Sequence, residues 1–204
     1  MAPVYKFSNA GGFTSKQRYT SMLAGNTTWN PWEPQGAYDA LSTVTVPAGG
    51  AASVTFAAIP TGYKHLQIRS ISRDSSGTIS QQYLRFNGDT GTNYSIHTLT
   101  GNGASAGTAG SAGANQPYIN CGIKSGPSDL ANSFGVSVID ILDYADTTKN
   151  KTVRTLSGVD LNGSGYVWMS SGAWRNTNAI TSIVLIPEVS SFVQYSQFTL
   201  YGVR

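Results

Sequence analysis

Apolar and polar residues alternate with a period of two along most of the chain after residue 40. In residues 41–46, for example, Val44 and Val46 fall on one side of an extended backbone, while Thr43 and Thr45 fall on the other. This alternation is typical of β-strands that bury one face against a core. It predicts strands at residues 41–46, 53–59, 64–73, 83–86, 134–142, 152–161, 166–174, 180–186 and 197–203.

Three features of this pattern carry further predictions. The turn Pro47–Gly50 separates the first two strands and predicts that they pair as a hairpin. Residues 134–142 are nearly continuously apolar, which favours a central strand covered on both faces. Residues 99–116 are rich in Gly and Ala and offer no apolar anchor, so we expect a long exposed loop there.

Residues 41–204 are therefore predicted to form an all-β domain, an antiparallel β-sandwich. About eight to ten strands at regular spacing, short turn-rich connections and the lack of a helical pattern favour this class. Among sandwiches, we expect a jelly roll rather than an immunoglobulin-like fold, because the strand number is high and no Cys…Trp…Cys pattern is present.

Residues 1–40 lack the alternation and are predicted to form an extended N-terminal arm. A short helix is expected at residues 14–24, where Tyr19 and Leu23 share one helical face. Apolar residues on an arm without a core of its own must be covered, either by the sandwich or by another subunit. The predicted anchoring residues of the arm are Tyr19, Met22, Leu23, Trp29 and Trp32.

The composition indicates an ordered protein with a nearly neutral surface. Charged residues make up 11% of the chain, well below the roughly 25% of an average soluble protein. Gly, Ser, Thr and Asn fill the polar positions, which suits packing against neighbouring proteins. The net charge of +3 includes one small cluster, Lys149, Lys151 and Arg154, which we interpret as a solvated loop. No nucleic-acid partner and no membrane insertion are predicted, because three cations neutralise few phosphates and no long apolar run is present.

The sequence offers little for catalysis or for metal binding. Its two histidines, His65 and His97, are not accompanied by a Gly-x-Ser-x-Gly motif, and Asp140 and Asp143 stand three apart on one predicted strand. Side chains at that spacing point to opposite faces of a strand, so the two carboxylates cannot act on one bond unless the strand is bulged. The lone Cys121 provides neither a disulfide partner nor a zinc motif. We predict a non-enzymatic protein without catalytic residues, cofactor or metal.

Several aromatic residues are candidates for ligand binding. The apolar faces of sugar rings stack on flat aromatic side chains, so a row of these on one sandwich face could recognise a cell-surface glycan. Packing in the core is the commoner use of such residues and remains the alternative at each position. The candidate residues are Tyr94, Tyr118, Trp168 and Trp174.

Framework motifs of turns and strands occur in six segments: Tyr19–Asn26, Ala40–Val46, Ile59–Arg69, Leu84–Gly91, Val138–Tyr144 and Tyr195–Val203. Together, and in this order, they resemble a family of small virion structural proteins of tailed phages, frequent among aquatic and cyanobacterial phages. The resemblance covers nearly the whole chain and supports family and fold more than a particular role.

This resemblance implies a jelly-roll head, assembled as a homotrimer and attached to the virion by its N-terminal arm. We therefore expect a structural, fibre-like appendage whose partners are copies of itself and other virion proteins of the capsid, portal or tail. The expected location is the virion, assembled in the host cytoplasm. One alternative is a capsid decoration protein that clamps capsomers. A second alternative is a module that binds a host surface glycan.

Overall fold

The computed structural model describes residues 37–75, 77–103 and 111–204. These residues form twelve β-strands and no helix, and thus no helix that could cross a membrane. The strands are β1 (Tyr38–Thr45), β2 (Val54–Phe56), β3 (His65–Ser72), β4 (Ser80–Phe86), β5 (Tyr94–Gly101), β6 (Ser111–Gln116), β7 (Ile119–Lys124), β8 (Gly135–Leu142), β9 (Lys151–Asp160), β10 (Gly165–Trp174), β11 (Ile183–Pro187) and β12 (Gln197–Val203).

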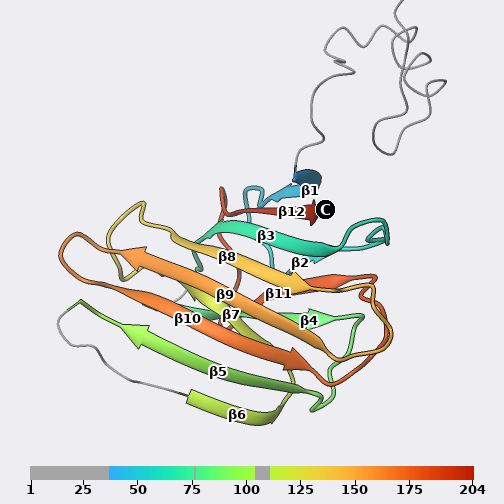
Figure 1. Cartoon of the computed structure of the whole chain (residues 1–204). Helices are drawn as coiled ribbons and strands as arrows, with labels where there is room; N and C mark the ends of the chain where they lie inside the picture. Colours follow the sequence, from blue (N-terminus) through green and yellow to red (C-terminus); the bar gives the residue numbers. More distant parts are fainter. Residues whose placement is uncertain (1–36, 76, 104–110) are drawn as a thin grey trace, which may run out of the picture. The chain divides into compact units, whose positions relative to one another are not determined.

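Two antiparallel sheets pack face to face as a β-sandwich, which confirms the predicted fold class (Figure 1). The large sheet has eight strands in the order β1-β12-β3-β8-β9-β10-β5-β6, and the small sheet has four in the order β2-β11-β4-β7. We call the face of the large sheet that contacts the small sheet its inner face, and the opposite face its outer face. The core lies between the sheets, since inward side chains of both are buried.

Aromatic residues fill one end of this core. The rings of Tyr94 and Trp174 stand 6.3 Å apart on neighbouring strands of the large sheet, and Phe86 of the small sheet packs against both. All three side chains are buried. The indole Nε1 of Trp174 donates a 2.7 Å hydrogen bond to Asp89, and Tyr94 donates from its hydroxyl to the Asp89 carbonyl at 3.0 Å. Buried polar atoms in this cluster are thereby satisfied.

Strand β7 lies unusually close to the large sheet. Every residue of β7 is buried, and Gly122 has a φ of +143°, so the strand is held in a conformation that side chains disfavour. A Cβ atom at Gly122 would stand 2.3 Å from the Oγ of Ser137. Small hydroxyl residues on the inner face make this approach feasible, because larger side chains would collide with the β7 backbone.

Those hydroxyls also close the free edge of the small sheet. The backbone N–H of Ile123 donates to the Oγ of Ser157 at 3.0 Å, and Ser170 donates from its Oγ to the Asn120 carbonyl at 2.9 Å. An edge strand normally presents such backbone groups to solvent or to another chain. In β7 the side chains of the large sheet take the place of a neighbouring strand.

A buried ion pair fixes the end of β7. The Nζ of Lys124 lies 3.1 Å from a carboxylate oxygen of Asp74, and both side chains have no exposed surface. Nζ also donates to the Ser80 hydroxyl at 2.6 Å and to the Gln81 carbonyl at 2.7 Å. Burial lowers the pKa of Lys124 and the Asp74 carboxylate opposes that shift. The charged amine is therefore held by hydrogen bonds on several sides.

Some sequence predictions are wrong. The first two strands do not form a hairpin: β1 pairs with β12 in the large sheet, whereas β2 pairs with β11 in the small sheet. Residues 99–116 are not one long loop, because they include the end of β5 and all of β6. The cause is that β6 pairs through its backbone with β5, so it needs few apolar side chains to be placed.

The expectation for residues 134–142 is also wrong. The strand β8 buries only alternate residues, and its outward side chains Val136, Val138 and Leu142 are 52%, 38% and 44% exposed. Among the described residues, nothing covers this face of β8. Its apolar residues therefore point both into the core and out of the sandwich.

The predicted arm falls almost wholly outside the described residues. Its expected helix at residues 14–24 and its anchoring residues Tyr19, Met22, Leu23, Trp29 and Trp32 lie there and remain predictions. Strand β1 begins at Tyr38, so the last residues assigned to the arm belong to the large sheet.

Candidate functional site

An exposed row of apolar side chains crosses the outer face of the large sheet. Val138 of β8, Leu156 of β9, Met169 of β10 and Leu99 of β5 are direct cross-strand neighbours in the pairing register. Their side chains are 38%, 54%, 50% and 51% exposed. The four side chains form a row because directly paired residues of neighbouring antiparallel strands point to the same face of the sheet.

A second apolar row runs beside the first. Ile71 of β3 pairs with Val136 of β8, and Val136 is followed across the sheet by Gly158 of β9 and Val167 of β10. Val167 is 61% exposed. We call the exposed residues of the two rows the apolar patch: Ile71, Leu99, Val136, Val138, Leu156, Val167 and Met169. Contiguous apolar patches of this kind mark contact surfaces on soluble proteins.

Polar residues border the apolar patch. On the next row along the strands, Arg154 of β9 contacts Asp140 of β8 at 2.9 Å, and Gln67 of β3 donates to the same carboxylate at 2.8 Å. This row therefore carries one cation and one anion that neutralise each other. Arg69, beside Val138, packs its guanidinium over the ring of Tyr201 at 5.2 Å.

At one end of the apolar patch the outer face is hollowed into a groove. The groove has a volume of about 620 Å³ and lies between Val136 and Val167, at the position where Gly158 leaves no side chain. Gly101 of β5, Phe134 and the residues of the turn between β9 and β10 also line it. Its polar residues include Asp160, Asn102, Ser133 and Ser164.

A smaller cavity of about 270 Å³ lies on the other side of Tyr166. Trp168 lines it together with Gln81 and Glu188. The Trp168 Nε1 atom is buried and has no hydrogen-bond partner among the described residues. Such groups are rare in folded proteins, because an unmade hydrogen bond costs about 1–3 kcal/mol.

The four aromatic residues predicted to face a ligand do not form one platform. Tyr94 and Trp174 are core residues, 0% and 1% exposed, so the prediction is wrong for them. Tyr118 is half-buried and stacks on Tyr83 at 3.8 Å between ring centroids. Trp168 lines the smaller cavity. Residue type alone does not separate these cases, since aromatic side chains serve cores and surfaces equally well.

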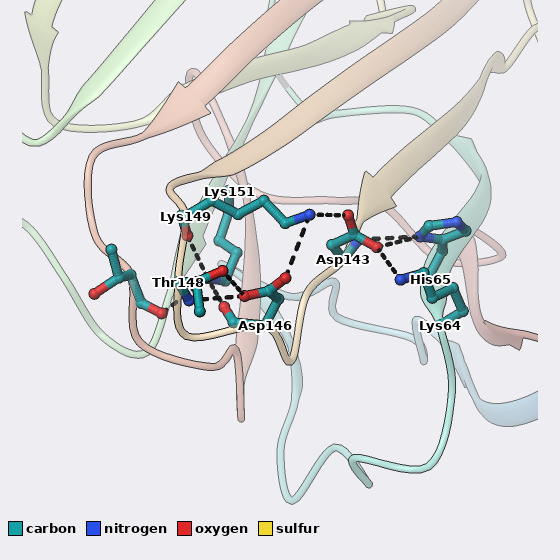
Figure 2. A network of polar contacts seen from close by, with 8 residues as sticks. Lys64, His65, Asp143, Asp146, Thr148, Lys149 and Lys151 are labelled. Carbon is teal, nitrogen blue, oxygen red and sulfur yellow. Dashed lines mark hydrogen bonds and ion pairs between the residues drawn. The ribbon is translucent and has the colours of Figure 1, made fainter.

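A network of charged residues gathers where β3 meets the connection between β8 and β9 (Figure 2). The carboxylate of Asp143 contacts the Nζ of Lys64 at 3.0 Å and that of Lys149 at 2.6 Å. Hydrogen bonds from these two lysines lower the pKa of Asp143. Its backbone N–H donates to the Nδ1 of His65 at 3.0 Å, so the proton of the neutral imidazole lies on Nε2.

The rest of this network shapes the turn after β8. Thr148 donates to Asp146 from its N–H at 2.7 Å and from its hydroxyl at 2.6 Å, which lowers the pKa of Asp146 to about 2. The Nζ of Lys151 is buried and donates to three backbone carbonyls, those of Asp146, Lys149 and Thr177. Asp143 itself has a φ of +47°, as in a turn. Asp143 and Asp146 therefore shape the turn that follows β8.

These groups give no arrangement that activates a nucleophile. The carboxylate of Asp143 is held by two lysines, the hydroxyl of Thr148 donates to Asp146, and His65 uses Nδ1 to accept a backbone hydrogen bond. The other histidine, His97, is exposed on the outer face of β5. Within the described ranges, no group of three or more His, Cys, Asp and Glu residues could hold a metal ion. That the protein is not an enzyme stays a prediction.

Cys121 is a buried thiol in β7. Burial raises its pKa to about 12, although a hydrogen bond from Gln82 acts in the opposite direction. A thiol in this state is protonated at neutral pH and does not react as a nucleophile. Its role is to fill space between the sheets.

Comparisons of the chain with protein-family models, with curated proteins and with solved structures find no match.

The apolar patch was not predicted, although the sequence carried a signal. In residues 134–142 and 166–169, apolar side chains occupy both odd-numbered and even-numbered positions. A strand with one face in solvent needs apolar side chains on its buried face only. For residues 134–142 the excess predicted burial on both faces of the strand.

Proposed function

We propose that the chain is a non-enzymatic structural protein that assembles with copies of itself through the apolar patch, as a fibre-like appendage of a phage particle. The apolar patch is the observation that carries the proposal. Folding does not require it, because the inner face already supplies the core. A protein with 11% charged residues has few like charges to keep such faces apart.

The strand order supports the jelly-roll interpretation that accompanies this proposal. When the pairs β5–β6 and β9–β10 are set aside, the large sheet reads β1-β12-β3-β8 and the small sheet β2-β11-β4-β7. The eight remaining strands, numbered one to eight along the chain, then follow the orders 1-8-3-6 and 2-7-4-5. A jelly roll made of two Greek keys has this arrangement. The four extra strands extend the large sheet and supply most of the apolar patch.

The partner that best fits the apolar patch is a second copy of the chain. Self-contact requires a surface that does not repel itself, and the only charged pair in the bordering row, Arg154 and Asp140, is internally neutral. In a trimer whose apolar patches face the threefold axis, the arginine of one copy can approach the carboxylate of the next. The trimer implied by the phage resemblance is the expected number of copies.

Sedimentation velocity of the full-length protein over a concentration series tests self-assembly. We expect the wild-type protein to form an oligomer and the double variant Leu156→Asp/Met169→Asp to sediment as a monomer. A matched double variant, Thr43→Asp/Thr45→Asp, adds the same charge on exposed residues of β1 and should keep the oligomer. A monomeric wild-type protein, or an unchanged oligomer in the patch variant, would contradict the proposal.

The place of the protein in a particle separates an appendage from the alternative of a capsid decoration protein. Imaging of labelled particles should find a few copies at a vertex or on the tail. Copies spread over the whole shell would favour decoration. The full-length variant Trp29→Ala/Trp32→Ala should enter particles less than the wild type, because the arm is proposed to attach the protein. Equal incorporation would exclude these two residues as the anchor.

A further inference from the structure

We propose that the smaller cavity beside Trp168 binds an organic cation, a quaternary ammonium group such as that of choline, held by aromatic rings and by the carboxylate of Glu188. The cavity is separate from the apolar patch, so this site can fail or succeed independently of the self-contact in the proposed function. Three properties of the cavity carry the inference: the face on which its rings stand, the charge of its lining and its size.

Two aromatic side chains of β10 line the cavity from the large sheet. Tyr166 pairs with Val159 and Trp168 pairs with Ser157, and both partners are buried between the sheets. Directly paired residues point to the same face of a sheet, so Tyr166 and Trp168 stand next to each other on the inner face. Tyr166 is nevertheless 43% exposed. The two rings therefore form an aromatic wall that the small sheet covers only in part.

The small sheet and the segment that leads into β4 supply the rest of the lining. Gln81 stands at the start of β4, Ile123 lies near the end of β7, and Glu188 directly follows β11. The side chain of Glu188 is exposed, and one of its carboxylate oxygens accepts the backbone N–H of Gln81 at 2.8 Å. This hydrogen bond holds the carboxylate in place at the cavity.

The lining carries one charge, and that charge is negative. Among the described residues that line the cavity, none is Lys, Arg or His, and Glu188 is the one carboxylate. No ion pair within the described ranges includes Glu188. Lys124 contacts two residues of the lining, Ser80 and Gln81, but its charge is matched by Asp74 at 3.1 Å. The cavity therefore disfavours anions and attracts a cation.

Aromatic rings beside a single carboxylate favour an organic ammonium over a metal ion. The negative face of an aromatic ring attracts a cation that lies within about 6 Å of the ring centre, and Trp attracts it most strongly. Calcium takes about six to eight oxygen ligands, whereas the described residues include no group of His, Cys, Asp and Glu that could hold a metal ion. The volume of about 270 Å³ lies below the roughly 300–1,000 Å³ of sites for larger ligands and fits a single head group.

Tyr166 and Glu188 offer variants that alter the site with little effect on folding, because both side chains are exposed. Tyr166→Leu removes the ring, whereas Tyr166→Phe keeps it. Glu188→Gln removes the charge and keeps an oxygen for the N–H of Gln81. Asp160→Asn is the matched control, since Asp160 is also exposed, does not line the cavity and keeps its acceptor oxygen for Asn162.

Saturation-transfer NMR on the full-length protein tests the site. The probes are tetramethylammonium and choline, with 3,3-dimethylbutan-1-ol as a neutral molecule of the same shape as choline. The wild type, Tyr166→Phe and Asp160→Asn should bind choline alike, whereas Tyr166→Leu, Trp168→Leu and Glu188→Gln should each bind it at least about threefold more weakly. The alcohol should bind the wild type at least about tenfold more weakly than choline, because it lacks the charge that the rings and the carboxylate attract.

Three results would overturn the proposal. Absence of transfer from both cations to the wild type would exclude the site. Equal binding of choline and the neutral alcohol would show an apolar cavity that does not select charge. Undiminished choline binding in Tyr166→Leu and Glu188→Gln would place the cation elsewhere on the protein. Sedimentation of the same variants distinguishes this site from self-assembly, since the oligomer should be unchanged when the cavity is altered.

Discussion

Next to β7, the two faces of the large sheet reverse the usual distribution of polar and apolar residues. On the inner face, next to β7, the strands carry Ser137, Ser157 and Ser170, all buried. On the outer face of the same strands stand Val138, Leu156 and Met169, which are exposed. The inner serines are explained by the close approach of β7: Ser157 and Ser170 bond its backbone, and Ser137 donates to the Ser157 hydroxyl. The outer residues have no such explanation within one copy of the chain.

This difference separates what folding requires from what assembly requires. A polar residue is tolerated inside when each of its atoms finds a partner, as in the hydrogen bonds of Ser157 to β7 and β8. An apolar residue outside contributes nothing to the core and favours contact with another molecule. The inner face is therefore predicted to control stability, and the outer face to control association.

The largest expected effect concerns the thiol in the middle of the inner region. The pKa of Cys121 is raised to about 12, so the reactive thiolate is nearly absent at pH 8, and the side chain is fully buried. Labelling by a thiol reagent at pH 8 should be at least about a thousand-fold slower in the native protein than in urea. Labelling at the unfolded rate would mean that β7 is not held against the large sheet.

The buried ion pair gives the next largest effect. Lys124→Met should lower the free energy of unfolding by about 3–5 kcal/mol, because removing one partner of a buried ion pair leaves the other without its counter-charge. Lys149→Met is the control, since Lys149 also pairs with an aspartate but its side chain is 51% exposed. That change should cost much less, because water screens an exposed ion pair. Equal losses in urea denaturation of the two variants would contradict this account of the inner region.

A pair of serines on opposite faces provides a smaller contrast. Ser157→Ala removes the acceptor for the Ile123 N–H and should cost about 1–3 kcal/mol. Ser171→Ala, on the exposed side of β10, should change the free energy of unfolding by less than about 0.5 kcal/mol. Equal free energies of unfolding for the two variants in urea denaturation would contradict this prediction.

The smallest expected effect concerns the apolar patch itself. Leu156→Ser should alter the free energy of unfolding of the monomer by about 0.5 kcal/mol or less, since the side chain is 54% exposed. On the same strand, Val153→Ala deletes buried methyl groups and should cost about 2 kcal/mol. Denaturation at a concentration where sedimentation shows monomers measures both. A large loss in Leu156→Ser would mean that this residue belongs to the core.

Strands with local pairing were predictable from the sequence. The segments 152–161 and 166–174 were predicted as strands, are joined by a short turn and pair with each other as β9 and β10. The partners of β1 and β2 were not predictable in the same way, because β12 and β11 lie far along the chain and no local feature specifies them. The turn between β1 and β2 was compatible with a hairpin and also with a crossing between sheets.

The candidate site was less predictable than the fold. The groove arises because Gly158 and Gly101 meet Val167 across two strand pairings, and that register is a property of the folded sheet. The groove was not predicted, whereas Tyr94 and Trp174 were singled out for a ligand and lie in the core. The buried strand β7 was missed because it mixes Gly122, Asn120 and Lys124 with apolar residues and shows no period of two.

Photo-crosslinking from the centre of the apolar patch tests the central claim most directly. Full-length protein carrying Leu156→p-benzoylphenylalanine would be prepared in light and heavy isotopes, mixed, irradiated and digested for mass spectrometry. We predict cross-links between light and heavy chains that join position 156 to peptides containing residues 134–142 or 166–171. Cross-links confined to single chains, at concentrations where the protein is fully folded, would contradict the assignment of the outer face to self-assembly.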